Sequence, residues 1–173
     1  MAAIGLPRAA LLGNSFGCQI AVECAVAHPE RVSHLILQGP TTDPSARTLV
    51  RQLWRWVRNS RFEPPTSSTM LRDYRRAGLG RAWSTGRYLL PDAIDEKLPR
   101  VRAPTLVVRG ERDPLVPQRW AEEAVRLLPD GRLVVIPDVA HTLVYFAPSA
   151  CARITRSFLL DGQPPAGQAD GMG

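Results

Sequence analysis

The sequence predicts an α/β protein in which helices flank a parallel sheet of about four strands. Two observations lead to this fold class. Short apolar runs alternate with stretches of helical periodicity along much of the chain, and each run is followed within two residues by Gly or Pro. Because strands that alternate with helices form right-handed βαβ units, we expect the strands to be parallel. The 173 residues are enough for one ordinary domain.

Four apolar runs have the length of buried strands and end in turn residues. The predicted strands are residues 9–12, 33–37, 105–108 and 133–136. Apolar residues at helical spacing predict further helices at residues 16–27, 120–128 and 150–160. Strand and helix therefore alternate in the first and the last third of the chain.

The middle of the chain has a different pattern, with helical periodicity but no convincing strand. Helices are predicted there at residues 46–59, 68–77 and 80–90. We expect these helices to form a cap over one end of the sheet. The predicted division is a core of residues 1–43 and 99–160, a helical cap of residues 44–98, and a disordered tail of residues 161–173.

The predicted cap carries basic and aromatic side chains that allow two interpretations. Four arginines at three- or four-residue spacing are expected to form a solvated helix face, and contact with an anionic substrate group is the alternative: Arg47, Arg51, Arg55 and Arg58. The large apolar residues are expected mainly to pack, although some could line a pocket. They are Trp54, Trp56, Phe62, Met70, Tyr74, Trp83 and Tyr88.

Composition argues against several classes of function. The net charge of +6 comes from arginines spread along the chain, with Lys97 the only lysine, so a nucleic-acid partner is not expected. No stretch of about 18 apolar residues could span a membrane, and the first residues do not resemble a signal peptide. Three cysteines without metal-ligand spacing suit buried thiols. We expect a cytoplasmic protein with no membrane partner.

A candidate nucleophile lies in the motif from Gly13 to Gly17, which matches G-x-S-x-G around Ser15. The pentapeptide alone is weak evidence, but here a predicted strand precedes it and a predicted helix follows it. A serine in so sharp a turn adopts a strained conformation, and its neighbours must be small. The backbone N–H of Phe16 would then face a developing oxyanion at the start of the helix.

Serine needs a base to remove its proton, and the chain offers three histidines. His28 lies at the end of a predicted helix, and His34 opens a predicted strand. His141 follows the last predicted strand, on the loop that leaves the carboxyl edge of the sheet. Because active sites of open α/β sheets lie at that edge, His141 is the preferred base.

The imidazole needs a carboxylate that fixes its tautomer and stabilises its charged form. Asp113 directly follows the third predicted strand, so the same sheet edge would present it. The chain order Ser15, Asp113, His141 is the order expected for this type of site. Asp43, after the second strand, is the alternative acid, whereas Asp138 is expected to shape the histidine loop.

These segments resemble the α/β-hydrolase family, in particular its cap-bearing, esterase-like branch. The resemblance lies in residues 12–18 as the nucleophile elbow, residues 28–32 as the end of the following helix, and residues 103–117 as the acid strand and loop. Ala140 stands where the family normally has Gly before the histidine.

The apolar residues of the predicted cap favour a small, hydrophobic substrate. The resemblance implies a serine hydrolase that acts on an ester or related acyl compound. It implies no metal and no organic cofactor. Alternatives within the family are hydrolysis of a carbon–carbon bond and acyl transfer to an alcohol. A non-catalytic remnant of the fold is the alternative from another class, and the sequence leaves the oligomeric state open.

A complete member of the family has about eight strands, with the elbow after the fifth. Here the motif begins at Gly13, so we expect the first four strands to be absent. With them would go the loop that supplies the second oxyanion donor, a loss that typically lowers the rate about 10²–10³-fold. The first strand would also present an open apolar edge. We therefore expect the polypeptide alone to be poorly soluble and nearly inactive.

Overall fold

The computed structural model describes residues 5–63 and 68–162, apart from some side chains between residues 68 and 83. Its four strands form one parallel sheet in the order β1-β2-β3-β4. The strands are β1 (Ala9–Asn14), β2 (Val32–Gln38), β3 (Thr105–Gly110) and β4 (Gly131–Ile136). The predicted α/β fold class and the parallel sheet are confirmed, and each strand is two residues longer than its apolar run.

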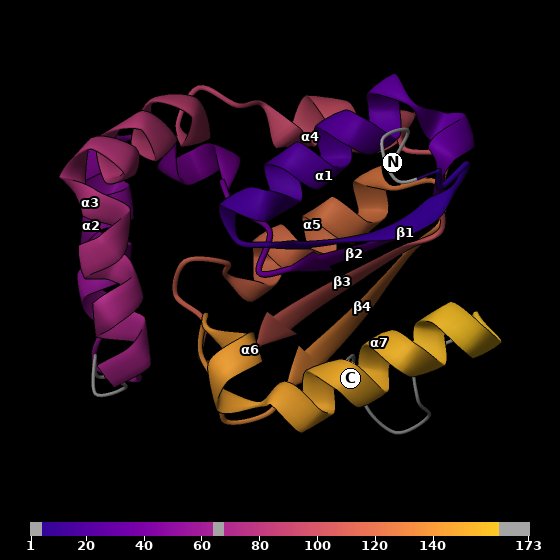
Figure 1. Cartoon of the computed structure of the whole chain (residues 1–173). Helices are drawn as coiled ribbons and strands as arrows, with labels where there is room; N and C mark the ends of the chain where they lie inside the picture. Colours follow the sequence, from indigo (N-terminus) through magenta and orange to yellow (C-terminus); the bar gives the residue numbers. More distant parts are fainter. Residues whose placement is uncertain (1–4, 64–67, 163–173) are drawn as a thin grey trace.

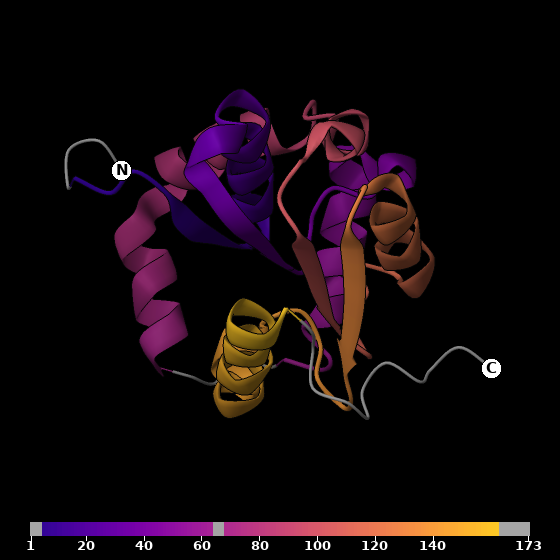
Figure 2. The same cartoon turned by 90° about the vertical axis from the view of Figure 1, so that its right-hand side faces the viewer.

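Helices cover both faces of the sheet (Figure 1 and Figure 2). One face is covered by α1 (Phe16–Ala27), α4 (Ile94–Lys97) and α5 (Gln118–Leu127). The other face is covered by α6 (Leu143–Phe146) and α7 (Pro148–Asp161). The three-layer arrangement follows from strands that bury apolar side chains on both faces.

Neighbouring residues of β2 show how one strand supplies both cores. Leu35 and Leu37 pack with α1 and α5, whereas Ile36 packs on the opposite side with α7. Each helical layer adds one fully buried aromatic side chain, Trp120 from α5 and Phe158 from α7. The Trp120 Nε1–H donates a hydrogen bond to the Pro40 carbonyl oxygen at 2.9 Å, so its burial leaves no donor without an acceptor.

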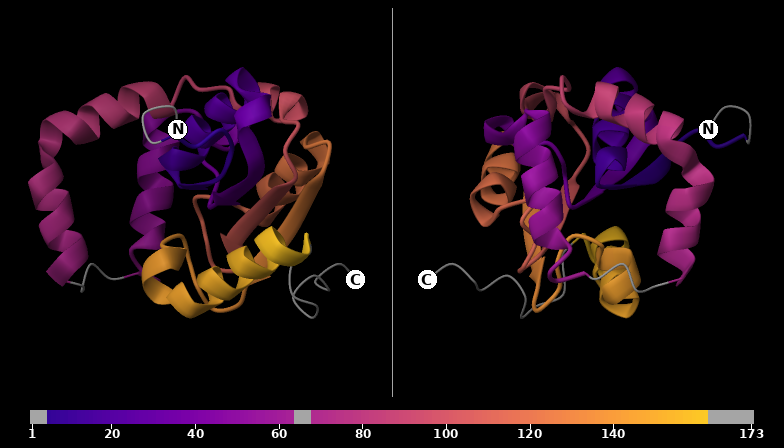
Figure 3. Two further views of the ribbon diagram at one scale, coloured as in Figure 1. Left: turned by 45° about the vertical axis from the view of Figure 1, so that its right-hand side comes forward. Right: turned by 90° about the vertical axis from the view of Figure 1, so that its left-hand side faces the viewer.

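The inserted segment (residues 44–98) lies between β2 and β3 and, in its described part, contains helices only. A 3₁₀ turn (Pro44–Ala46) precedes α2 (Leu49–Asn59), which therefore begins three residues later than its apolar pattern suggested. The helix α3 (Ser68–Leu89) bends visibly in Figure 3, and Gly78 has non-helical backbone angles there, φ 75° and ψ 158°. Gly78 lies between the two helices that the sequence predicted, and glycine adopts positive φ at little cost.

The expectation of a solvated arginine face is wrong for two of its four residues. Arg47 pairs with Asp95, and Arg55 pairs with the buried Asp43 at 2.7 Å. Arg51 and Arg58 are exposed as predicted. Polar side chains of α2 point toward the rest of the protein, because they form hydrogen bonds and ion pairs with carboxylate and carbonyl groups there.

Other differences from the predicted elements are small and have local causes. The four-residue helices α4 and α6 were not predicted, because so short a segment shows no periodicity. The helix α7 includes Asp161, the first residue of the predicted tail, and Gly162 ends it in a left-handed conformation. The rest of the predicted tail lies outside the described residues. Within the described parts of the chain, no helix combines the length and the apolar character that crossing a membrane requires.

Asp43 joins the loop after β2 to α2 and α5. Its fully buried carboxylate accepts hydrogen bonds from Arg55 Nη2 at 2.7 Å and from the Ser45 N–H at 2.9 Å, and it also pairs with Arg119. Burial alone would raise the pKa of Asp43, but the hydrogen bonds from Arg55, Ser45 and Arg119 hold it below its usual value. The ionised carboxylate therefore stabilises the fold above about pH 4, and this stabilisation is lost as the pH falls through the folded-state pKa.

We predict that Asp43→Asn lowers the free energy of unfolding by about 3 kcal/mol at pH 7, because it leaves Arg55 without a buried counter-charge. Chemical denaturation at pH 7 and at pH 3 measures the effect, and the difference between variant and wild type should shrink at the lower pH. Asp130→Asn is the control, since Asp130 forms an exposed pair and should change stability by less than about 0.5 kcal/mol. Equal effects of the two substitutions at pH 7 would contradict the prediction.

Candidate active site

Three loops at the carboxyl ends of the strands bring Ser15, Asp113 and His141 together. Ser15 lies between β1 and α1, Asp113 follows β3, and His141 follows β4. The Ser15 Oγ is 2.9 Å from His141 Nε2, and the Asp113 Oδ2 is 2.7 Å from His141 Nδ1. Both are hydrogen-bond distances. With its proton on Nδ1, the neutral imidazole donates to Asp113 and accepts from the Ser15 hydroxyl.

Ser15 has the strained backbone that the motif predicts, with φ 53° and ψ −121°. Its N–H donates to the Gln38 carbonyl oxygen at 2.9 Å, and its own carbonyl oxygen accepts from the Cys18 N–H at 2.9 Å. A Cβ atom on Gly13 would lie only 2.6 Å from the Gly17 carbonyl oxygen and 2.7 Å from Cys18 Cα. The turn can therefore close only when residue 13 has no side chain.

Phe16 is the first residue of α1. Its N–H thus belongs to the first helical turn, whose amides have no acceptor within the helix. The helix dipole adds partial positive charge at the same end. This position suits a donor to an oxyanion formed next to Ser15.

The loop after β3 fixes the Asp113 carboxylate through hydrogen bonds to its Oδ1 atom. Asp113 Oδ1 accepts hydrogen bonds from the N–H groups of Leu115, at 2.8 Å, and Val116, at 3.1 Å. Arg109 supports the same loop, since its Nε donates to the Val116 carbonyl oxygen at 2.9 Å and its Nη2 to that of Glu111 at 3.0 Å. These bonds stabilise the ionised carboxylate and leave Oδ2 for His141.

Two glycines that the motifs did not indicate as part of the site let the histidine loop approach the sheet. Gly39 directly follows β2 and has a φ of 60°, and a Cβ atom there would lie 2.9 Å from His141 Cε1. A Cβ atom on Gly110 would lie 2.1 Å from the Ala140 carbonyl oxygen. Their position just after the apolar runs is the sequence signal for this role, although a glycine there also serves simply to end a strand.

Opposing influences set the charge state of His141. Burial lowers the pKa of His141, but the negative charge of Asp113 and its hydrogen bond raise it, and the charge of Glu63 adds to this effect. The net result is a pKa above the ordinary histidine value. The site therefore favours the protonated, imidazolium form of His141.

The alternative residues lie elsewhere. His28 is exposed at the end of α1, and His34 packs edge-on against the Phe158 ring. Asp43 is held by arginines, and Asp138 has a positive φ of 61° and an exposed side chain that pairs with Arg112. The structure brings Asp113 to His141 instead.

The site gives no indication of a metal centre. Over residues 5–63 and 68–162, no group of three or more His, Cys, Asp or Glu side chains could hold a metal ion.

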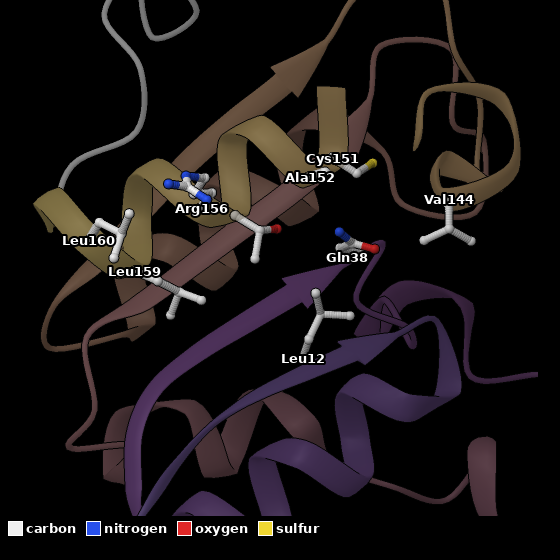
Figure 4. A pocket seen from close by; sticks show the side chains of 9 residues that line it. Leu12, Gln38, Val144, Cys151, Ala152, Arg156, Leu159 and Leu160 are labelled. Atoms are coloured by element: carbon white, nitrogen blue, oxygen red, sulfur yellow. The ribbon is translucent and has the colours of Figure 1, made fainter. Parts of the chain in front are cut away.

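Two hollows lie near these loops. An apolar groove of about 560 Å³ runs between the edge strand β1 and α7 (Figure 4). Its walls include Leu12, Gln38, Val144 and Leu159 but none of Ser15, Asp113 and His141.

A second hollow, of about 670 Å³, borders Phe16 and extends along Ile20 and Cys24 to Tyr88.

Comparison with known families agrees with this geometry. The family model for TAP-like proteins matches residues 79–171, and the model of the alpha/beta hydrolase fold matches residues 1–61. The chain belongs to the α/β-hydrolase family. The resemblance inferred from the elbow, acid and histidine segments is thereby confirmed.

Curated relatives include two hydrolases. A 2-hydroxy-6-oxo-6-phenylhexa-2,4-dienoate hydrolase of Burkholderia cepacia is 26% identical over 200 residues, which cover 94% of this chain and 66% of the relative. The human serine hydrolase BPHL is 30% identical over 153 residues, covering 83% of this chain and 52% of the relative. The α/β-hydrolase chain described here thus spans between half and two thirds of these relatives.

Solved structures share the fold as well. A bacterial membrane phospholipase A superposes with a TM-score of 0.72 at 30% sequence identity, over 93% of this chain and 59% of the phospholipase. The parallel sheet and its covering helices are therefore the common part of a larger hydrolase fold.

The two glycines of the elbow should respond differently to substitution. We predict that Gly13→Ala destabilises the protein by about 2 kcal/mol or more, because its Cβ atom would meet backbone atoms that cannot move aside. Gly17→Ala should change stability by less than about 1 kcal/mol, since no atom lies within 4 Å of the added Cβ. Chemical denaturation compares them directly, and equal losses would show that the elbow is not closed as described.

Proposed function

We propose that the protein is a serine hydrolase that cleaves an ester or a related acyl compound through an acyl-enzyme on Ser15. The observation that carries the proposal is the continuous hydrogen-bonded path from the Ser15 hydroxyl through His141 to Asp113, with distances of 2.9 and 2.7 Å. A hydroxyl so paired with an imidazole becomes nucleophilic, since a base stands ready for its proton.

In the proposed reaction, Ser15 Oγ attacks the carbonyl carbon of the substrate while His141 Nε2 takes the hydroxyl proton. The Phe16 N–H donates to the resulting oxyanion. The carbonyl then re-forms, the bond to the leaving alkoxide breaks, and His141 returns the proton to that oxygen. Asp113 stays ionised throughout and stabilises the imidazolium.

Water completes the cycle in the same way. His141 takes a proton from a water molecule, and the oxygen of that water attacks the acyl carbon. The bond to Ser15 Oγ breaks, and the serine regains its proton from His141. The products are a carboxylic acid and an alcohol.

A small, hydrophobic acyl group is the substrate we favour. The hollow next to Phe16 has the volume typical of a small-molecule site. Apolar side chains of Ile20, Ala27 and Pro91 contribute to its walls. Among the aromatic residues of the inserted segment, Trp54, Trp56, Phe62 and Tyr88 are exposed, which is compatible with contact to such a substrate; the side chains of Met70, Tyr74 and Trp83 lie outside the described residues.

Hydrolysis of a carbon–carbon bond next to a ketone is the second candidate. It is favoured by the relative from Burkholderia cepacia, whose name gives a 2-hydroxy-6-oxo dienoate as its substrate. The two candidates use the same residues and differ in the bond that is broken. Turnover of a p-nitrophenyl ester of a short fatty acid, compared with turnover of such a dienoate, separates them.

We predict that a fluorophosphonate probe labels the chain on a single residue, Ser15, and that Ser15→Ala abolishes the labelling. Prolonged incubation compensates for slow chemistry, because the probe reacts irreversibly with an activated serine. Ser60→Ala is the matched control, since Ser60 is exposed on the inserted segment and should leave labelling unchanged. Peptide mapping by mass spectrometry locates the adduct.

Persistent labelling of Ser15→Ala would exclude Ser15 as the nucleophile. A folded wild-type chain that is not labelled at all would favour a non-catalytic remnant of the fold. Labelling followed by transfer of an acyl group to an added alcohol, faster than release to water, would indicate an acyltransferase.

A further inference from the structure

Glu63, at the end of the turn that follows α2, is buried against the histidine loop although it lies far from it in sequence. One carboxylate oxygen accepts a hydrogen bond from the Thr142 backbone N–H at 2.5 Å. The other accepts from the Thr142 hydroxyl, also at 2.5 Å, and from Asn59 Nδ2 at 2.7 Å. Thr142 is the residue directly after His141.

These contacts connect the inserted segment to the histidine loop. Three groups donate hydrogen bonds to the carboxylate, one from Asn59 and two from Thr142. The two bonds from Thr142 fix both its backbone and its side chain. In the described part of the chain, no arginine or lysine forms an ion pair with Glu63. Its negative charge is therefore stabilised by hydrogen bonds alone, and it also acts electrostatically on the nearby His141.

We propose that Glu63 is a positioning residue of the hydrolase site, which holds the His141 loop over Ser15 through Thr142. The inference rests on the proposed function, because it assigns Glu63 a role in activating that serine. No local pattern predicts this role, because Glu63 precedes two prolines in the predicted cap and belongs to none of the recognised motifs.

The proposal has an electrostatic consequence in addition to a geometric one. The charged groups that act on His141 are Asp113 from the loop after β3 and Glu63 from the inserted segment. Both favour the imidazolium, whereas burial opposes it. Removing the charge of Glu63 should therefore lower the pKa of His141, and Ser15 should remain reactive at lower pH.

Three substitutions separate the charge from the anchor. Glu63→Gln removes the charge but keeps an oxygen acceptor and the shape of the side chain. Thr142→Val removes the hydroxyl donor and leaves the charge in place. Glu63→Ala removes both, and Glu96→Gln is the control, since it neutralises an exposed carboxylate of the same inserted segment.

The experiment measures the NMR titration midpoint of the His141 ring and the rate of fluorophosphonate labelling of Ser15 from pH 5 to 9. For Glu63→Gln we expect a lower midpoint, with labelling at pH 6 about threefold faster for a shift of about half a unit. For Thr142→Val we expect an unchanged midpoint and a limiting rate that is lower by about tenfold, as for a misplaced catalytic group. Glu63→Ala should combine the two effects.

The proposal is overturned if Glu63→Gln and Thr142→Val match wild type and Glu96→Gln in both midpoint and limiting rate. It is also overturned if Glu63→Gln raises the midpoint. The titration needs no catalysis, so the coupling of Glu63 to His141 can be judged even for a chain that the probe does not label, an outcome that counts against the proposed function instead.

Discussion

The site depends on one contact, the 2.7 Å hydrogen bond between His141 Nδ1 and the buried Asp113 carboxylate. It fixes the imidazole so that Nε2 faces the Ser15 hydroxyl, and it makes a positive charge on the ring acceptable inside the protein. Nearby backbone N–H groups and Arg109 hold the acid in place. Without this bond Ser15, the proposed nucleophile, would lack a base of fixed orientation.

The contact requires three loops to approach more closely than side chains normally allow. Gly13 permits the elbow to close, Gly39 leaves room for the His141 ring, and Gly110 leaves room for the backbone at Ala140. Each glycine lies at the carboxyl end of a strand, where parallel topology collects the loops. The sheet thus determines which loops meet, and the glycines, which have no side chain, determine how closely these loops approach one another.

Much of this arrangement could be predicted from the sequence. The apolar runs gave the four strands, and the positions of Ser15, Asp113 and His141 after three of them gave the site, because a parallel sheet presents such residues at one edge. The lengths of strands and helices were less predictable, since their first and last residues are set by caps and turns such as the 3₁₀ turn before α2.

Contacts between distant segments could not be predicted in this way. Periodicity shows which residues share a face of a helix, but it does not show which buried group that face contacts. The pattern therefore predicts Arg55 in solvent, whereas it forms an ion pair with Asp43. Glu63 shows the same limit, because nothing in its local sequence indicates Thr142 as its partner. The partners of polar side chains that connect the inserted segment to the core are determined by the tertiary structure and not by local sequence.

The most direct test asks whether His141 and Asp113 act as one unit on Ser15. The measurement is the rate at which a fluorophosphonate acylates Ser15 in His141→Ala, in Asp113→Asn and in the double variant. Residues of one relay are strongly non-additive, so the double variant should react about as slowly as His141→Ala alone. Losses that multiply in the double variant would mean that the two side chains act independently, and would contradict the relay.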